Sequence, residues 1–310
     1  MNNYTCKICH NNFNNQEYIV KEMMFGLDHH FKYFKCSSCG CLQINDVPQN
    51  LSDYYPSNYY SFSHIERVDI FKKIKMFIKR KIIKYRFYGF SLIGFLFSKY
   101  LKSFYWLDRA YCNTNSKILD IGCGNGFLIN ELYQLGFVNV QGLDPYAPIQ
   151  KQMNDKVKIH KIGILDLDDK FDFIMLHHTF EHLENPKEIL KKLYDSLNPG
   201  SCLLIRIPIV SSFAFRKYGV NWVQLDAPRH IFLHTPTSIN MLARETGFKV
   251  AKVLYDSTDF QFTGSEKYQN NIPLIKNYIF KKKELRFFSK QAKLLNAIRD
   301  GDSACFYLVK

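Results

Sequence analysis

The sequence predicts an α/β fold in which a doubly wound, mostly parallel sheet follows a small cysteine-rich module and a basic helical segment. Two Cys-x-x-Cys pairs lie within the first 39 residues, and a glycine-rich loop at 122–126 separates a short apolar run from a helical pattern. From 118 to 208, apolar runs alternate with helical patterns, which is typical of parallel sheets covered by helices. A chain of 310 residues is long enough to bury one large domain of this kind together with smaller additions.

Residues 1–45 predict a zinc ribbon. The two Cys-x-x-Cys pairs are separated by 26 residues, which leaves room for a hairpin with strands at 18–25 and 29–36. Each pair can point two thiolates at one ion. Four thiolates leave no coordination position on the ion open to water or substrate, so the zinc is expected to be structural. His10 and Cys41 are close enough in sequence to compete with the predicted zinc ligands, which are Cys6, Cys9, Cys36 and Cys39.

Residues 46–112 predict an aromatic and basic helical linker. Between 66 and 102 there are eleven Lys or Arg against two acidic residues. Apolar side chains recur there at helical spacing, at Ile70, Phe71, Ile74, Phe77, Ile78 and Ile82. We expect this helix to pack its apolar face on the following domain as a lid. The alternative is contact with an anionic membrane, because basic amphipathic helices bind such surfaces.

Residues 113–310 predict the main domain, with a basic C-terminal extension. The stretch ILDIGCGNGF indicates a strand at 118–121 and a glycine turn, followed by a helix at 127–135 and a second strand at 138–143. Glycines let the backbone turn sharply and let a ligand lie against it. A dinucleotide fingerprint requires a glycine at position 127, where this chain has Phe127, so the register is G-x-G-x-G.

Together with Asp120 before the loop and Asp144 after the second strand, this loop resembles the first two motifs of class I S-adenosylmethionine-dependent methyltransferases. The resemblance implies a Rossmann-like domain with S-adenosylmethionine as cofactor. It implies that Asp120 and the loop hold the methionyl part and that Asp144 binds the ribose hydroxyls. An acid after the second strand also suits a nicotinamide enzyme, which stays a competitor. The predicted cofactor residues are Asp120, Gly122, Gly124, Gly126, Asp144, Ile164, Leu165 and His178.

The resemblance continues for about a hundred residues. A third strand and its loop at 158–167 place apolar residues against the adenine. A fourth strand within 170–186 is followed by a Glu-His-hydrophobic pattern, and a helix begins at Pro186 and ends at 199–200. A fifth strand is expected at 202–208, and the segment 303–310 is suited to the last strand of the sheet.

The segment 209–248 is the candidate substrate region. It resembles a pattern found in a ribbon-bearing methyltransferase branch whose members act in bacterial pathways for surface polysaccharides or sugar modification. The residues that carry this resemblance are Trp222, Asp226, Arg229 and His230. The candidate substrate contacts are Trp222, Asp226 and Arg229, together with His182, which is included for its chemistry. A sugar hydroxyl must lose its proton as it attacks a methyl group, and histidine is the usual acceptor near neutral pH. The candidate bases are His230 and His178.

The predicted activity is methyl transfer from S-adenosylmethionine to a sugar hydroxyl of a nucleotide sugar or bacterial surface glycan. C-methylation of a keto-sugar is one alternative. Another is an RNA methyltransferase that holds RNA with the ribbon and the basic stretches, because the net charge is +14. Against RNA, the chain has HHTF where amino-methylating nucleic-acid enzymes place an Asn/Asp-Pro-Pro motif. A non-catalytic binding module is disfavoured by the intact cofactor motifs.

The sequence also predicts where the protein is found. The first ten residues lack the basic and then apolar pattern of a signal peptide, and the uncharged apolar run at 87–98 is too short to span a bilayer. We therefore expect a cytoplasmic protein with reduced cysteines, in contact with the inner membrane face if the basic helix binds lipid.

Overall fold

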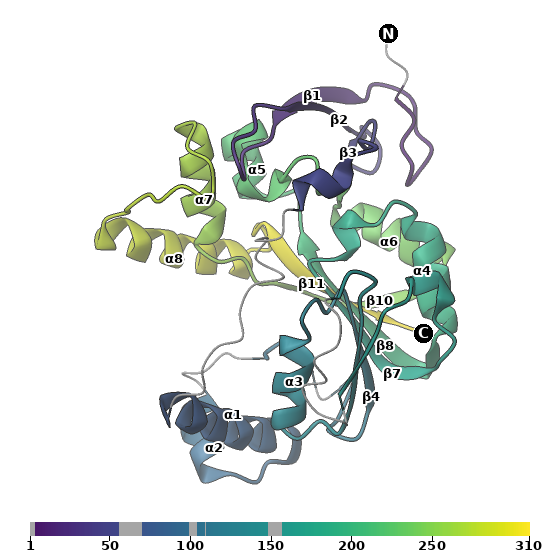
Figure 1. Cartoon of the computed structure of the whole chain (residues 1–310), viewed down its shortest axis with the longest axis vertical. Coiled ribbons are helices and arrows are strands. Elements are labelled where there is room, and N and C mark those ends of the chain that lie inside the picture. The colour runs from purple at the N-terminus through teal and green to yellow at the C-terminus, as the bar shows by residue number, and fades with distance from the viewer. Residues whose placement is uncertain (1–3, 56–69, 99–103, 109, 148–156) are drawn as a thin grey trace. The chain divides into compact units, whose positions relative to one another are not determined.

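The computed structural model describes residues 4–55, 70–98, 104–108, 110–147 and 157–310 (Figure 1). Its larger sheet has seven strands in the order β10-β11-β8-β7-β4-β5-β6. In that order the strands are Lys249–Tyr255, Ser303–Val309, Leu197–Pro208, Phe171–His177, Lys117–Ile121, Asn139–Leu143 and Lys158–His160. Strand β4 pairs in parallel with β5 and β7, and β5 pairs in parallel with β6. The predicted Rossmann-like α/β fold is confirmed.

The helices begin where the sequence indicates. Helix α3 (Phe127–Gln134) starts directly after the glycine loop, and α4 (Pro186–Asp195) starts at a proline, which suits the first helical turn. Strand β8 begins at Leu197, so the expected turn at 199–200 lies inside a longer strand. Helices α5 (Phe213–Tyr218) and α6 (Pro236–Glu245) follow it. The C-terminal extension folds into α7 (Phe260–Gln269), α8 (Lys282–Ala297) and the predicted last strand, β11.

The N-terminal module forms a second sheet in the order β1-β2-β3-β9. Strands β1 (Gln16–Lys21), β2 (His30–Lys35) and β3 (Leu42–Ile44) come from the predicted ribbon. Strand β9 (Phe232–Leu233) comes from the candidate substrate region and pairs antiparallel with β3, with Leu42 opposite Leu233. The ribbon sheet is therefore completed by a strand that is almost 200 residues away in sequence.

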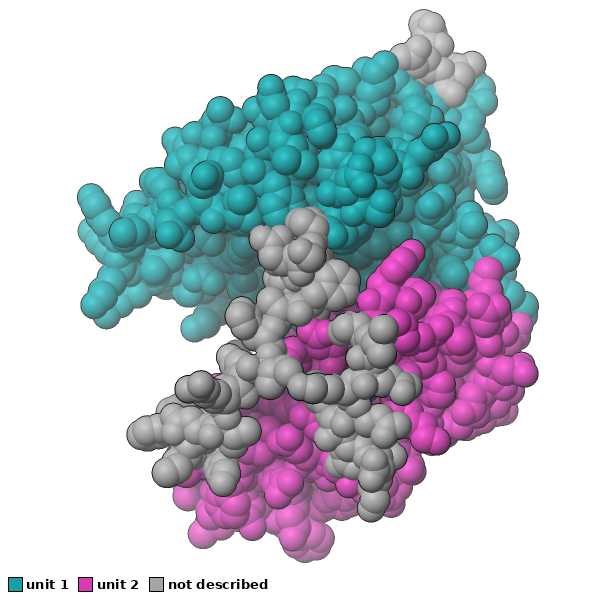
Figure 2. Space-filling model, viewed as in Figure 1, with its two compact units in different colours: residues 1–56, 178–191, 205–308 teal, residues 57–177, 192–204, 309–310 magenta. Residues whose placement is uncertain are grey.

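Contacts divide the chain into two compact units, which Figure 2 distinguishes by colour. Unit 1 comprises 1–56, 178–191 and 205–308, and unit 2 comprises 57–177, 192–204 and 309–310. This division differs from the three consecutive domains expected at 1–45, 46–112 and 113–310. The ribbon shares unit 1 with residues 205–308 because β9 belongs to its sheet.

The basic segment forms α1 (Ile70–Tyr88) and the shorter α2 (Leu92–Ser98) in unit 2. Lys79 of α1 pairs with Glu131 of α3, and Tyr88 at the end of α1 bonds Thr114, which precedes β4. The second half of α1 therefore lies by the edge of the sheet where β4 begins, at the opposite end of this strand from the glycine loop. This position does not match the expected lid over the site. Residues 56–69 of the expected linker lie outside the described residues.

Within the described part of the chain, none of the helices combines the length and apolar character needed to cross a bilayer.

Candidate functional site

The glycine loop lies in unit 2, where β4 ends and α3 begins. Gly122, Gly124 and Gly126 all have positive φ, at 75°, 52° and 73°, a region that residues with a Cβ atom rarely adopt. A Cβ atom on Gly126 would lie 2.8 Å from the Ile159 side chain, so this position also requires a residue without a side chain. The backbone amide of Gly122 donates to the carbonyl of Leu143 at 2.8 Å, which ties the loop to the end of β5.

Two carboxylates lie at this loop. Asp144 follows β5, and its Oδ2 accepts a hydrogen bond from the Gly124 amide at 2.9 Å. Asp120, in β4, is 3% exposed. Burial, together with the charge of Asp144, raises the pKa of Asp120 to about 8. An uncompensated buried carboxyl of this kind favours a cationic ligand, and the resemblance implies that the methionyl part of the cofactor, which carries an ammonium group, lies here.

Cofactor binding should therefore release a proton from Asp120. Near pH 7 this carboxyl is mostly protonated in the free protein, because its pKa is about 8, and a cationic group beside it would favour the carboxylate. We expect the affinity for S-adenosylhomocysteine to rise with pH below about pH 8, by up to roughly tenfold per pH unit. Calorimetry in buffers of different ionisation enthalpy measures the proton released. Asp120→Asn should abolish this proton release. Wild-type binding that releases no proton would contradict the assignment.

The predicted adenine contacts follow β6. Ile164 and Leu165 lie on a short 3-10 turn at 164–166, with Ile164 buried and Leu165 46% exposed. Because β4, β5 and β6 are parallel neighbours, the glycine loop, Asp144 and this turn all lie at the carboxyl edge of the sheet. Ligands of open α/β sheets bind at that edge.

The four predicted zinc ligands come together in the ribbon of unit 1. The Sγ atoms of Cys6 and Cys39 are 3.6 Å apart, those of Cys9 and Cys36 are 3.5 Å apart, and all four lie within 4.8 Å of one another. A tetrahedral zinc site with bonds of about 2.3 Å has sulfur–sulfur edges of roughly 3.8 Å, so the cluster fits this ion. Cys41 is fully buried outside the cluster, and its thiol points to the Leu42 carbonyl.

A second cluster in unit 1 surrounds Glu181. This side chain is fully buried, and neither carboxylate oxygen has a hydrogen-bond partner among the described residues. His178 Nδ1 lies 3.5 Å from Glu181 Oε1, and His230 Nε2 lies 3.9 Å from the same oxygen. Burial raises the pKa of Glu181, but the His178 imidazole and the neighbouring His182 and His230 together lower it to about 2. A carboxylate is therefore held among three imidazole rings.

The backbone fixes the orientation of two of these rings. His182 Nδ1 lies 2.8 Å from the Arg229 carbonyl, and His230 Nδ1 lies 2.7 Å from the Gln224 carbonyl. A carbonyl only accepts, so we assign the proton to Nδ1 and the lone pair to Nε2 in both rings. Burial lowers the pKa of His230 to about 4, so this ring is neutral near pH 7. One ligand atom each from Glu181, His182 and His230 lie within 4.8 Å of one another, close enough for a shared cation.

His178 differs from His230 because it is accessible. Its side chain is 35% exposed, against 7% for His230. It has a positive φ of 51°, which is uncommon for a residue other than glycine and often marks functional positions. Its amide donates to the Arg206 carbonyl at 2.9 Å. Of the two candidate bases, His178 is the one that both reaches solvent and is backed by a buried carboxylate.

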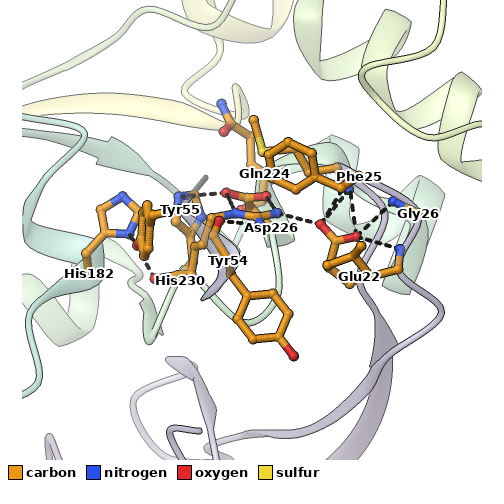
Figure 3. Close-up of polar contacts among 12 residues, drawn as sticks. Glu22, Phe25, Gly26, Tyr54, Tyr55, His182, Gln224, Asp226 and His230 are labelled. Carbon is orange, nitrogen blue, oxygen red and sulfur yellow. Dashed lines mark hydrogen bonds and ion pairs between the residues drawn. The ribbon is translucent and has the colours of Figure 1, made fainter. Parts of the chain in front are cut away.

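Arg229 and Asp226 belong to a buried ionic network, and Figure 3 shows the polar contacts around it. Arg229 is fully buried and binds Asp226 through Nε at 3.0 Å and Nη2 at 2.6 Å. Its Nη2 also lies 2.9 Å from Glu22 Oε1, and its Nη1 donates to the Tyr54 carbonyl. Glu22 in turn accepts hydrogen bonds from the backbone amides of 24–27. The guanidinium therefore joins the ribbon to the segment that carries His230.

The structure gives the other predicted substrate residues different environments. Trp222 is fully buried, and its Nε1 donates to Asp302 at 2.9 Å. An enclosed indole offers no face to a ligand, and the guanidinium is fully buried among Asp226, Glu22 and the Tyr54 carbonyl, so we assign Trp222 and Arg229 to the core of unit 1. Asp226 is 13% exposed and paired with Arg229. His182 is half-buried and also contacts the Tyr55 hydroxyl at 3.2 Å.

Sequence reasoning missed Glu181 and Glu22. The signal for Glu181 was present in the Glu-His-hydrophobic pattern, but nothing local distinguishes a buried acid from an exposed one there. Glu22 sits in a strand-forming run of the ribbon, and its partner Arg229 is 207 residues away. Only the tertiary fold brings the two together.

Part of this chain is similar in sequence to known proteins. The ubiquinone biosynthesis O-methyltransferase of Saccharomyces cerevisiae is 32% identical over 123 residues, which cover 35% of this chain and 39% of that protein. The tRNA U34 carboxymethyltransferase of Helicobacter acinonychis is 32% identical over 108 residues, with coverage of 31% and 41%. The ubiquinone biosynthesis O-methyltransferase of Pseudomonas fluorescens is 24% identical over 168 residues, with coverage of 48% and 71%. The chain thus spans about two fifths of the length of the first two relatives.

Solved structures give weaker similarity. A methyltransferase from Archaeoglobus fulgidus, described as S-adenosylmethionine-dependent, has a TM-score of 0.43 at 18% identity and covers 78% of this chain and all of its own. The mycolic acid cyclopropane synthase CmaA1 has a TM-score of 0.43 at 17% identity, with coverage of 63% and 78%. A family model described as a methyltransferase domain matches residues 96–253, slightly more than half of the chain. The chain therefore belongs to the methyltransferase-domain family.

Proposed function

We propose that this protein transfers a methyl group from S-adenosylmethionine to a hydroxyl of a sugar, carried as a nucleotide sugar or in a bacterial surface glycan. We assign the proton-accepting role to His178. The observation that supports this role is the arrangement of an accessible imidazole against Glu181, a fully buried carboxylate without another hydrogen-bond partner among the described residues.

The arrangement is that of an acid–histidine pair, in which a carboxylate orients an imidazole. When His178 Nδ1 carries a proton and faces Glu181, its Nε2 is left with a lone pair that can accept the proton of a hydroxyl. The buried carboxylate then stabilises the imidazolium that forms. The contact of 3.5 Å is long for a hydrogen bond, and such contacts often shorten when substrate binds.

S-adenosylmethionine held at the glycine loop would supply an electrophilic methyl carbon, with the sulfur as a neutral thioether leaving group. The protein must hold the acceptor oxygen in line with that carbon–sulfur bond, and positioning of this kind can provide much of the rate. As the new carbon–oxygen bond forms, the hydroxyl proton passes to His178. Neutral His230 lies 3.9 Å from the same Glu181 oxygen, and its ring contacts that of His182 at 4.7 Å between centroids.

Two considerations favour a sugar hydroxyl. The ubiquinone-biosynthesis relatives are named as O-methyltransferases, which supports oxygen as the nucleophile. The sugar itself rests on the resemblance of residues 222–248 to the surface-polysaccharide branch. An RNA acceptor is the second candidate, because one relative is named as acting on tRNA U34 and the chain carries a net charge of +14.

The test offers methyl-labelled S-adenosylmethionine with nucleotide sugars, lipid-linked glycans or total RNA. We expect label in a sugar pool, and we expect His178→Ala to reduce turnover by roughly 10²–10⁴-fold because the proton acceptor is lost. The exposed His30→Ala serves as the matched control and should behave as wild type.

Four outcomes would change the assignment. Label confined to RNA would overturn the sugar acceptor. A loss in His230→Ala with normal turnover in His178→Ala would move the proton acceptor to His230, and a methyl group on carbon in the product would indicate C-methylation of a keto-sugar. Turnover that rises with Mg²⁺ in wild type but not in Glu181→Gln would indicate a cation at Glu181 instead of proton transfer.

A further inference from the structure

The pair formed by α1 and α2 in unit 2 exposes an unusual amount of apolar surface. Helix α2 has the sequence LIGFLFS, and Leu92 and Leu96 are 76% and 55% exposed. The exposed apolar side chains of this segment are Phe90, Leu92, Ile93, Phe95, Leu96 and Phe97. On α1, Ile74 and Phe77 are also about half exposed. Contiguous exposed apolar surface of this kind marks an interaction site on a folded protein.

The exposure is not caused by loose packing between the two helices. Gly94 of α2 lies so close to α1 that a Cβ atom there would be 2.1 Å from the Lys81 carbonyl oxygen. The rings of Tyr85 and Phe95 contact edge to face at 5.6 Å between centroids, and Ile82 and Ile83 of α1 are buried. The helices thus have a common buried face, and the remaining apolar residues of α2 point outward as a set.

The same segment is strongly basic. Residues 70–97 contain eight Lys or Arg and no Asp or Glu. Lys79 is paired with Glu131 of α3, whereas Lys75 and Lys84 are exposed on α1. An apolar surface flanked by uncompensated positive charge complements a bilayer that contains anionic lipids.

We propose that the α1–α2 pair docks on an anionic membrane surface. The apolar side chains of α2 enter the boundary between headgroups and acyl chains, and the lysines of α1 contact the lipid phosphates. Helix α2 has seven residues and is therefore about 10 Å long, so it lies in the interface and does not cross the bilayer. Self-association through this face would bring two strongly positive segments together, which charge repulsion disfavours.

This inference goes beyond the proposed methyl transfer and does not depend on the acceptor. The contact of Tyr88 with Thr114 places the end of α1 at the edge of the sheet where β4 begins, and α2 packs on this half of α1. Membrane contact there leaves the opposite, carboxyl edge with the glycine loop uncovered. A membrane-bound protein of this kind is suited to an acceptor whose carrier is a lipid.

Sedimentation with vesicles tests the proposal without any substrate. We expect the full chain to sediment with phosphatidylglycerol-containing vesicles and to remain in solution with phosphatidylcholine vesicles. A triple variant with Phe90→Gln, Leu92→Gln and Leu96→Gln changes only exposed side chains and should weaken binding at least tenfold. The matched control changes Leu294, Ile298 and Ile279 to Gln, which are exposed in unit 1, and should bind as wild type.

The outcomes separate the possible occupants of this surface. Lys75→Gln with Lys84→Gln should weaken binding and make the remaining binding less sensitive to salt. Equal sedimentation of wild type and the apolar triple variant would overturn the proposal. So would a concentration-dependent dimer that the triple variant abolishes, since this would identify a second copy as the occupant. S-adenosylhomocysteine binding should be unchanged in the triple variant, so failure of this proposal is distinguishable from failure of the methyltransferase assignment.

Discussion

Arg229→Ala should lower the free energy of unfolding by about 3–5 kcal/mol, because it leaves buried carboxylates without their cation. Asp226 and Glu22 both depend on this guanidinium, and the Arg229 and Glu22 side chains are fully buried in unit 1, whereas Asp226 is 13% exposed. Burial alone would raise the pKa of Asp226, but Arg229 holds it below its ordinary value. Unfolding in urea, followed by circular dichroism, measures the loss.

Two variants make this measurement specific. Arg216, 58% exposed, pairs with Asp300 at 2.6 Å, and Arg216→Ala should change stability by at most about 1 kcal/mol because exposed ion pairs contribute little. Adding Glu22→Gln to Arg229→Ala should recover part of the loss, since it removes one unpaired charge. Equal stabilities of Arg229→Ala and Arg216→Ala would show that the buried network does not hold the ribbon.

The stability supplied by Asp226 also has a defined pH dependence. Its folded pKa is depressed, so its contribution is present above the ordinary carboxyl value and is lost as the pH falls through the lower, folded value. The contribution is therefore complete near neutral pH, where the Arg229 variants are best compared.

We expect the four-cysteine cluster to hold zinc, and removal of this ion should have the second large effect. Structural zinc contributes about 10–16 kcal/mol to the folding of zinc-finger peptides, so we expect the ribbon to unfold without it. The effect should extend to the histidine cluster, because Tyr33 of β2 donates to the His230 carbonyl at 2.8 Å and β3 pairs with β9. Zinc content by mass spectrometry and hydrogen exchange in β1–β3 measure both consequences.

Cys39→Ser and Cys41→Ala are a matched pair for this test. Both cysteines are buried in the ribbon, but only Cys39 belongs to the four-thiol cluster. We expect Cys39→Ser to lose zinc and Cys41→Ala to keep one zinc per chain. Full zinc content in Cys39→Ser, or unchanged exchange protection after zinc removal, would contradict the assignment.

Much of the fold could be predicted from the sequence because its signals are local. The glycine loop, the apolar runs of β4 and β5, and Pro186 at the start of α4 each act within a few residues. Hydrophobic periodicity and turn chemistry are sufficient for such elements. The cysteine quartet could be predicted for the same reason, since each pair is a short motif and the two pairs together supply the four thiolates that tetrahedral zinc takes.

The histidine cluster could be predicted only in part. The sequence indicated His178 and His230 as bases, but it gave no measure of their exposure, and this is what favours His178 over His230. Burial of Trp222 and Arg229 depends on contacts with residues 80 and more than 170 positions away. Residue type alone suggests a ligand contact for such side chains, whereas the fold places them in the core.

Strand β11 has a consequence for synthesis of the protein on the ribosome. It lies between β8 and β10 and contains residues 303–309, whereas β8 already ends at Pro208. In unit 1, the amide of Ile209 donates to the carbonyl of Asp302, and that of Asp256 donates to the carbonyl of Ser303. Neither neighbour can complete this pairing until residues 303–309 have emerged. The nascent chain therefore carries an unpaired edge on β8 while the residues between β8 and β11 are synthesised, and an open edge of this kind is a site where partly folded chains aggregate or chaperones bind.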